Sequence, residues 1–272
     1  MSETEYAIHP RSTLHRHKER AHYDYGTIHK IMNTAPIWHV SFLPSDPSDP
    51  FPCMLPMLGQ MASFANPDAD PEADALDLYI HGHAASRLMR LPTASSQGNG
   101  NGDENEGVPV CISAAHIDSL ILSLTPFNHS SAYRSAIIHG YATTVTSEDE
   151  KLFAMYRITN GLIPQRWENS RSPPTKSELI STGILRVRVV SASAKVNVGG
   201  PSDDRKDLKN EEVLDSVWTG VVPVYERLGT PVEAPVNRVK EVPAYLKGWI
   251  EERNREGEAY AKKTATMEKK KG

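Results

Sequence analysis

The sequence predicts an α+β protein built on an antiparallel β-sheet that closes into a barrel. Roughly six or seven segments alternate between apolar and polar residues, as strands do, and two or three have helical spacing. The strand-like segments cluster and the helical ones fall between hairpin groups, unlike a βαβα alternation. No Gly-x-Gly-x-x-Gly follows a strand, which argues against a dinucleotide-binding fold.

Composition narrows the class of protein further. The 272 residues suit one large domain or two small ones, and 39% hydrophobic residues suffice for a core. A net charge of −4, with one basic run at 269–271, argues against nucleic acid as a partner. No apolar run approaches a membrane helix, and the N-terminus has no signal core. Cys53 and Cys111 are interpreted as reduced buried thiols, so we expect a cytoplasmic protein without a membrane partner.

The first part of the chain alternates polar and periodic segments. Residues 1–15 are polar and are expected to form a disordered N-terminus. Helical spacing of Ala21, Tyr25, Ile28 and Met32 predicts a helix over 18–33. Strands are predicted at 37–42, 51–58 and 77–82, and mobile insertions at 65–76 and 93–107.

The second part begins with three predicted strands, at 108–113, 117–124 and 132–145. Ser147 and Glu150 form a Ser-x-x-Glu capping box, which predicts a helix that ends at Asn160-Gly161. The remaining elements are a short helix at 177–180, a strand at 184–190, a polar segment at 199–216 and an apolar run at 218–224. Pro243 begins a helix that runs to about residue 255, and the Lys-rich tail is expected to fray. We therefore divide the chain into a barrel domain at 16–225 and a C-terminal extension at 226–272 with one helix.

The stretch YIHGHAASRLMRL at 79–91 is the most informative local pattern. A strand ends in small residues and is followed at once by Ser86 and Arg87. A guanidinium matches phosphate geometry bidentately, and small residues such as Gly82 let a ligand approach the backbone. The pattern suggests a phosphate site at Ser86-Arg87. The plainer interpretation is that Ser86 caps a short helix and that Arg87 and Arg90 are solvated.

Two further places could contact a flat ligand. Tyr133 and Ser135 share one face of a predicted strand and Arg134 lies on the other, so Ser135 could donate to a ring carbonyl or phosphate. Trp218 could form an aromatic wall beside a ligand. The alternatives are an ordinary strand start and a tryptophan of the core or of a dimer contact.

Histidines raise the question of a metal or haem. His81 and His83 share a strand face, and His139 could lie nearby, yet no carboxylate falls at ligand spacing and no His-Glu-x-x-His is present. We therefore predict no metal site. An axial haem ligand among His81, His83, His129 and His139 stays open. The sequence contains no Gly-x-Ser-x-Gly motif, so nothing indicates covalent catalysis by a serine.

Taken together, several segments resemble a known family. They are ERAHYDY, MLPML, YIHGHAASRLMR, HIDSLILSLTPFNHSSAYRSAIIHGYA, SAKVNVGGP and VWTGVVPV. Over roughly residues 16–225 the chain is similar to the pyridoxamine 5′-phosphate oxidase-related, FMN-binding split-barrel proteins. Within that family it is most similar to the flavin-nucleotide-binding branch, which includes the nitroimidazole-resistance reductases.

The resemblance implies a homodimer of split β-barrels with flanking helices and two FMN sites at the subunit interface. It places the strand segment Met54–Met57 against the flavin ring, and the segment His81–His83 beside the ring and the ribityl chain. It places Ser86 and Arg87 at the phosphate, Ser135 where the oxidase has a glutamine, and Trp218 as a residue reaching in from the second subunit. The full implied cofactor set is Met54, Leu55, Pro56, Met57, His81, Gly82, His83, Ser86, Arg87, Tyr133, Arg134, Ser135 and Trp218.

Two departures from the oxidase bear on function. At the phosphate position the oxidase has an Arg-Lys pair, whereas this chain has Ser86-Arg87 followed by Leu88, one cation fewer. The oxidase's C-terminal Arg-x-His pattern is also missing. Pyridoxamine phosphate is therefore not the expected substrate. We expect an FMN-binding protein, a flavin-dependent oxidoreductase acting on an unidentified small molecule. The alternatives are a haem-binding or haem-degrading split-barrel protein and a non-catalytic dimeric binding scaffold.

Overall fold

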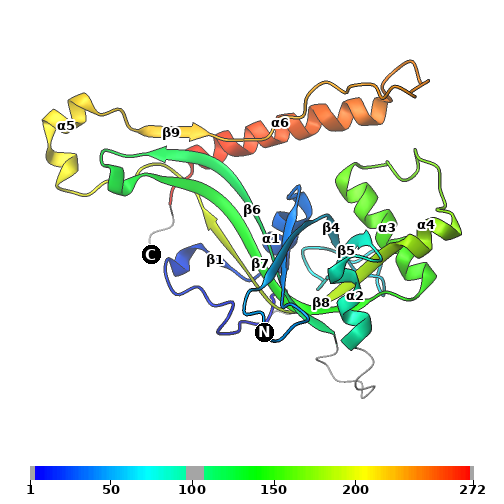
Figure 1. Cartoon of the computed structure of the whole chain (residues 1–272). Helices are drawn as coiled ribbons and strands as arrows, with labels where there is room; N and C mark the ends of the chain where they lie inside the picture. The colour runs from blue at the N-terminus through cyan, green and yellow to red at the C-terminus, as the bar shows by residue number, and fades with distance from the viewer. Residues whose placement is uncertain (1–3, 96–106, 270–272) are drawn as a thin grey trace. The chain divides into compact units, whose positions relative to one another are not determined.

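A computed structural model describes residues 4–95 and 107–269 (Figure 1). Most of the predicted mobile insertion at 93–107 lies outside these residues. The described chain is a nine-stranded antiparallel sheet with flanking helices, so the predicted α+β class is confirmed. The strands are β1 (Ala21–His22), β2 (Trp38–Phe42), β3 (Cys53–Met57), β4 (Gly59–Ala62), β5 (Asp77–His83), β6 (Val108–Leu122), β7 (Ser130–Thr144), β8 (Thr182–Asn197) and β9 (Gly220–Pro223).

The sheet is open, which corrects the prediction of a closed barrel and matches a split barrel. Hydrogen-bonded neighbours follow the order β3-β2-β6-β7-β8-β5-β4, while β1 pairs with β8 and β9 with β6. The path therefore starts at β3 and ends at β4, two strands that are consecutive in the chain and separated by Leu58. Strands β3 and β4 form the two ends of the sheet and are linked through Leu58. In the described part of the chain, the order of paired strands contains no β3–β4 pairing, so the sheet does not close there.

Gly59 explains why the predicted strand at 51–58 gives way to a second strand. A Cβ at this position would lie 2.4 Å from Cζ3 of Trp38 and 2.6 Å from the carbonyl oxygen of Tyr79. Only glycine lets the chain pass between these two groups. At this point the chain leaves β3, which pairs with β2, and enters β4, which pairs with β5. The split in the barrel is therefore located by a close approach that periodicity cannot reveal.

The helices are α1 (Tyr25–Thr34), α2 (Arg87–Ser95), α3 (Glu148–Leu162), α4 (Lys176–Ser181), α5 (Glu211–Ser216) and α6 (Ala244–Thr266). The prediction of a helix over 18–33 was wrong before residue 25. Residues 18–22 form a 3-10 turn and β1, because the Asp24 side chain caps α1 by accepting from the Thr27 amide at 2.8 Å. None of the helices in the described ranges is long and apolar enough to cross a membrane.

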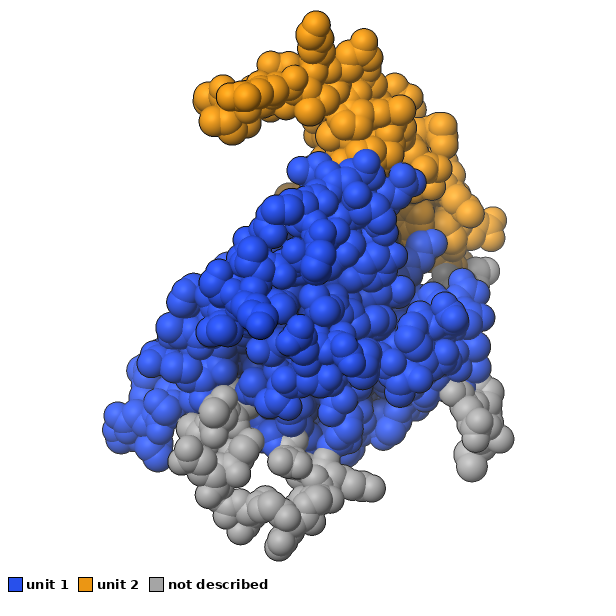
Figure 2. Space-filling model, turned by 90° about the vertical axis from the view of Figure 1, so that its right-hand side faces the viewer, with its two compact units in different colours: residues 1–115, 135–194 blue, residues 116–134, 195–272 orange. Residues whose placement is uncertain are grey.

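The chain forms two compact units, coloured in Figure 2. Unit 1 comprises 1–115 and 135–194, and unit 2 comprises 116–134 and 195–272. Each of the three long strands β6, β7 and β8 contributes residues to both units. This division differs from the sequence-based boundary at residue 225.

Unit 1 contains the main apolar core and a second cluster under α3. Alternate residues of β2, among them Trp38 and Val40, are buried, as periodicity predicted. The second cluster joins Tyr79 and Ile184 of the sheet to Ala154 and Ile158 of α3. Helix α3 is thereby fixed against β5 and β8, the strands that carry the candidate site.

The N-terminal segment, predicted to be disordered over 1–15, contains a buried contact of unit 1. Tyr6 is 7% exposed, its hydroxyl oxygen lies 2.6 Å from Nε2 of His29, and it also donates to the Leu76 carbonyl at 3.2 Å. Nδ1 of His29 lies 2.7 Å from the Pro71 carbonyl oxygen, and the Tyr25 ring stacks on the imidazole. These polar contacts join residue 6 to residues 29, 71 and 76, which local composition cannot show.

Unit 2 is organised around a buried ion pair. Asp118 is 3% exposed, and its Oδ1 accepts from Nη2 of Arg134 at 2.8 Å, while Oδ2 accepts from Nε at 3.0 Å. The Arg134 guanidinium lies over the Tyr260 ring of α6, 4.1 Å from its centroid. These contacts attach α6 to the β6 and β7 segments of the same unit.

Candidate functional site

The turn that leaves β5 is ordered by local hydrogen bonds. The Ala85 amide donates to Nδ1 of His83 at 3.1 Å, and the Ser86 amide donates to the His83 carbonyl at 2.8 Å. Helix α2 begins at Arg87, and the Arg90 amide donates to the Ser86 carbonyl at 3.3 Å. Ser86 therefore directly precedes the helix, at the N-cap position. The first amides of α2 have no acceptor within the helix.

Arg87 is exposed and is directed toward β2. Its Cζ lies 5.7 Å from the centroid of the Phe42 ring, and no ion pair engages it among the described residues. A helix N-terminus and an unpaired guanidinium both favour anions. The structure thus combines the two sequence interpretations, because the residue that follows the cap is also an available cation.

Two glycines hold α2 close to the sheet. Gly82 of β5 pairs with Gly183 of β8, and a Cβ on either would lie 3.0 Å from the Met89 side chain. The space in front of Gly82 is therefore occupied by Met89 and by Met57, whose Cε would lie 3.5 Å from that Cβ. The glycines permit a helix, rather than a ligand, to approach the strands, and this sets the position of Arg87.

Most of the other residues of unit 1 that were predicted to contact the flavin lie on β3 and β5. Side chains of β3 alternate, and Met54 is 61% exposed, whereas Met57 lies within reach of Gly82. His83 is exposed. Nδ1 of His81 is buried without a hydrogen-bond partner in the described structure. Of these β3 side chains, Met57 is the one that approaches the β5–α2 turn, through Gly82.

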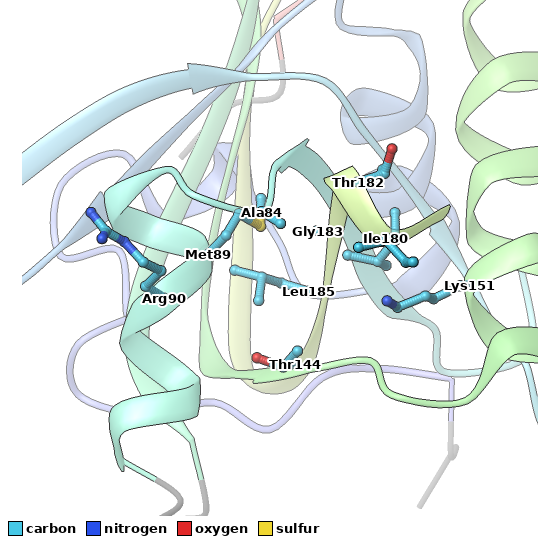
Figure 3. Close-up of a pocket in the computed structure, with 10 residues that line it drawn as sticks. Ala84, Met89, Arg90, Thr144, Lys151, Ile180, Thr182, Gly183 and Leu185 are labelled. Atoms are coloured by element: carbon cyan, nitrogen blue, oxygen red, sulfur yellow. The ribbon is translucent and has the colours of Figure 1, made fainter. Parts of the chain in front are cut away.

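A cavity of about 410 Å³ lies beside the β5–α2 turn (Figure 3). Ala84 and Met89 line it on one side, Gly183 and Leu185 form part of the sheet wall, and Lys151 extends into it from α3. Arg90 also lines the cavity, and its guanidinium extends away from the other labelled side chains (Figure 3). Lys151 makes no ion pair within the described ranges. Sequence reasoning missed Lys151, because a lysine after three acidic residues is typical of a solvated helix face.

The remaining predicted site residues are distributed differently. Tyr133, Arg134 and Trp218 belong to unit 2, whereas Ser135 belongs to unit 1. Arg134 is engaged by Asp118 and Tyr260, so its charge is already compensated. Trp218 is 67% exposed, and its ring covers Gly220, where a Cβ would lie 2.5 Å from Cη2.

Titratable groups near the site include a linked set on β5, β8 and α3. The Tyr79 hydroxyl donates to Oε1 of Glu150 at 2.9 Å, and Nη1 of Arg186 donates to the same oxygen at 3.3 Å. Burial raises the pKa of Asp77, opposed by the charge of Arg186. The capping box predicted at Ser147 is present in one half, since the Glu150 amide donates to Ser147 Oγ at 3.4 Å while the Glu150 carboxylate serves this set. The described residues contain no cluster of three or more His, Cys, Asp or Glu able to hold a metal.

Comparison with known proteins identifies the family. Residues 24–196 match the family model of pyridoxamine 5′-phosphate oxidase, so the chain belongs to that family. The matched range includes the β5–α2 turn and the Tyr133–Ser135 segment and ends before Trp218. Among curated proteins, none matches the chain.

Solved structures show the same fold. The flavocytochrome Anf3 from Azotobacter vinelandii is 23% identical, with 90% of this chain and 98% of that one covered at a TM-score of 0.68. The FAD and haem binding protein from Mycobacterium smegmatis is also 23% identical, with 85% and 97% covered at a TM-score of 0.66. A candidate 5-nitroimidazole antibiotic resistance protein from Bacteroides thetaiotaomicron is 16% identical, with 68% and 96% covered, and its TM-score of 0.44 is too low for a structural argument.

Proposed function

We propose that this protein binds a flavin nucleotide, FMN, with its phosphate at the β5–α2 turn, and acts as a flavin-dependent oxidoreductase. The observation that carries the proposal is the start of α2 at Arg87, where helix amides without an acceptor inside the helix lie beside a guanidinium without an ion pair among the described residues. Membership of the pyridoxamine 5′-phosphate oxidase family supports it. So does the likeness in fold to a flavocytochrome and to an FAD and haem binding protein.

The residues present fit such a group. Arg87 can bind two phosphate oxygens at once, and the Ser86 hydroxyl and the α2 amides supply further donors. Because Nδ1 of His83 accepts from the Ala85 amide, the neutral imidazole carries its proton on Nε2 and can donate to a flavin or ribityl oxygen. A bound flavin would supply hydride and electron transfer, whereas the protein orients it and sets its electrostatic surroundings.

We further propose that the active form is a homodimer. Unit 2 exposes many apolar side chains for a monomer, including Ile117, Leu120 and Val222 near the β6–β9 pairing, and Phe127 is 98% exposed. A second copy of the chain would cover such surface, and Trp218 would then contribute to the partner's flavin site. Light scattering coupled to size-exclusion chromatography should give about twice the chain mass; a single-chain mass would contradict the dimer.

Haem is the second candidate cofactor. It is supported by Nδ1 of His81, a buried imidazole nitrogen without a partner in the described structure, and by the two neighbours whose names include a cytochrome and haem. Haem titration should produce a Soret band that is lost in His81→Ala but kept in His15→Ala, an exposed histidine elsewhere in unit 1. No Soret band at micromolar haem would eliminate this candidate.

The deciding experiment is an absorbance spectrum of the purified protein, with mass spectrometry of what denaturation releases. Arg87→Ala should then weaken flavin binding about 10- to 100-fold, the range expected for one charge-assisted contact. Arg16→Ala is the control, because Arg16 is an exposed arginine elsewhere in unit 1 and does not line the cavity. Equal flavin affinity in Arg87→Ala and the wild type would contradict the proposed phosphate site.

A further inference from the structure

A second cavity, of about 230 Å³, belongs to unit 1 and shares no lining residue with the β5–α2 cavity. Its floor comes from strands that are adjacent in the sheet, β2, β6, β7 and β8. Its rim includes Arg11 of the N-terminal segment. Family resemblance and sequence motifs assign nothing to this place.

The cavity is electrostatically positive. Its lining contains Arg11 and no Asp or Glu among the described residues. Nδ1 of His9 accepts from Nε of Arg11 at 2.9 Å, so His9 contacts Arg11 without neutralising it, and other guanidinium donors remain. Two ring walls, Phe42 and Tyr141, each have a guanidinium against them, from Arg87 at 5.7 Å and Arg188 at 5.8 Å. Such surroundings favour an anion.

His139 supplies an independent indication of a ligand. It lines the cavity, and its Nδ1 is buried without a hydrogen-bond partner in the described structure. An unsatisfied buried nitrogen is costly, and a polar group of a ligand would satisfy it. Burial lowers the pKa of His139, and the nearby charge of Arg11 lowers it further, which favours the neutral imidazole. A neutral imidazole can donate or accept one hydrogen bond at each nitrogen.

The rest of the lining is apolar and limits the size of the ligand. Phe42, Leu43, Pro52 and Pro109 provide rigid apolar walls. The volume lies below the range of about 300–1,000 Å³ that is usual for larger ligands. A single aromatic ring with one or two substituents suits a cavity of this volume.

We propose that this cavity binds a small aromatic carboxylate. Its carboxylate pairs with Arg11, its ring lies among Phe42 and the prolines, and a polar ring substituent hydrogen-bonds to Nδ1 of His139. The proposal goes beyond flavin binding. Its polar contacts, Arg11 and His139, are not part of the proposed phosphate site, although the Phe42 wall also contacts Arg87 of that site.

Three probes separate the contributions. 4-Hydroxybenzoate has the charge and the ring hydroxyl, benzoate lacks the hydroxyl, and 4-hydroxybenzyl alcohol lacks the charge. Calorimetric titration of the full-length protein should give one saturable site per chain. We expect 4-hydroxybenzoate to bind about 10-fold or more tightly than the alcohol, as charge-assisted contacts allow, and several-fold more tightly than benzoate.

Variants locate the site. Arg11→Gln should abolish the preference for 4-hydroxybenzoate over the alcohol, whereas Arg16→Gln, an exposed arginine of the same segment, should retain it. His139→Leu should bind benzoate like the wild type yet lose the preference for the hydroxylated probe. A purely structural role of His139 would weaken both probes alike. Thermal unfolding of each variant confirms that it is folded.

Two outcomes would overturn the proposal. One is no saturable binding of any probe at millimolar concentration. The other is equal affinity for 4-hydroxybenzoate in Arg11→Gln and the wild type. Titrations of flavin-loaded and flavin-stripped protein keep this result separate from the proposed function. Protein that binds flavin but no carboxylate contradicts only this inference, and protein that binds carboxylate but no flavin contradicts only the other.

Discussion

Arg87 of unit 1 and Arg134 of unit 2 follow similar sequence signals but have opposite surroundings. Each stands next to a serine at one end of a strand and was predicted to contact a ligand. Arg87 is exposed beside the Phe42 ring without an ion pair in the described structure. Arg134 is held by a nearly buried carboxylate and an aromatic ring. The difference teaches that the partner, and not the local motif, decides whether an arginine is available for a ligand.

The largest expected effect tests the structural arginine. Arg134→Ala leaves the Asp118 carboxylate buried without its partner, and this should lower the free energy of unfolding by about 3–5 kcal/mol. Denaturant titration measures the loss. The double variant Asp118→Leu/Arg134→Met should recover most of it, because no uncompensated charge is then buried. A loss below about 1 kcal/mol in Arg134→Ala would remove the contrast between the two regions.

A smaller effect is expected from the ring over the same guanidinium. Tyr260→Leu removes the cation–π contact of Arg134 and should lower stability by about 1–2 kcal/mol, part of it lost packing. Tyr260→Phe keeps the ring and should lose much less. The same denaturant titration compares the two variants, and equal losses would show that the hydroxyl rather than the ring face stabilises α6.

A pH-dependent effect is expected from the Tyr6–His29 contact of unit 1. Burial lowers the pKa of His29, so the unfolded chain takes up the proton more readily than the folded one. Stability should therefore fall as pH falls below the ordinary value of 6.5 toward the lower pKa of the folded state. His29→Gln should flatten this slope, and His15→Gln, exposed in the same unit, should leave it unchanged. An identical slope in His29→Gln would assign the acid sensitivity to other groups.

The smallest stability effect is expected from the arginine proposed to bind phosphate. Arg87→Ala removes an exposed side chain without an ion pair, so the free energy of unfolding without ligand should change by less than about 0.5 kcal/mol. The variant is thus predicted to lose ligand affinity at unchanged stability, the reverse of Arg134→Ala. A destabilisation similar to that of Arg134→Ala would mean that Arg87 is structural.

Elements that depend on short-range sequence patterns were predicted well, whereas contacts between residues distant in the chain were not. Alternation located most strands, and the Ser147 cap located the start of α3. The segments predicted as separate strands at 108–113 and 117–124 form one continuous strand, β6 (Val108–Leu122). The polar segment at 199–216 contains α5, which Asn210 caps by accepting from the Val213 amide at 3.3 Å.

The sequence by itself determined the antiparallel α+β class, the family and the position of Arg87 at the end of a strand, because each depends on neighbouring residues. Only the tertiary structure decided three other features. Gly59 splits the barrel because of Trp38, Arg134 is engaged because of Asp118 and Tyr260, and Lys151 reaches a cavity because α3 packs on the sheet. In each case the deciding contact joins residues far apart in the chain, and its free energy exists only once the chain has folded.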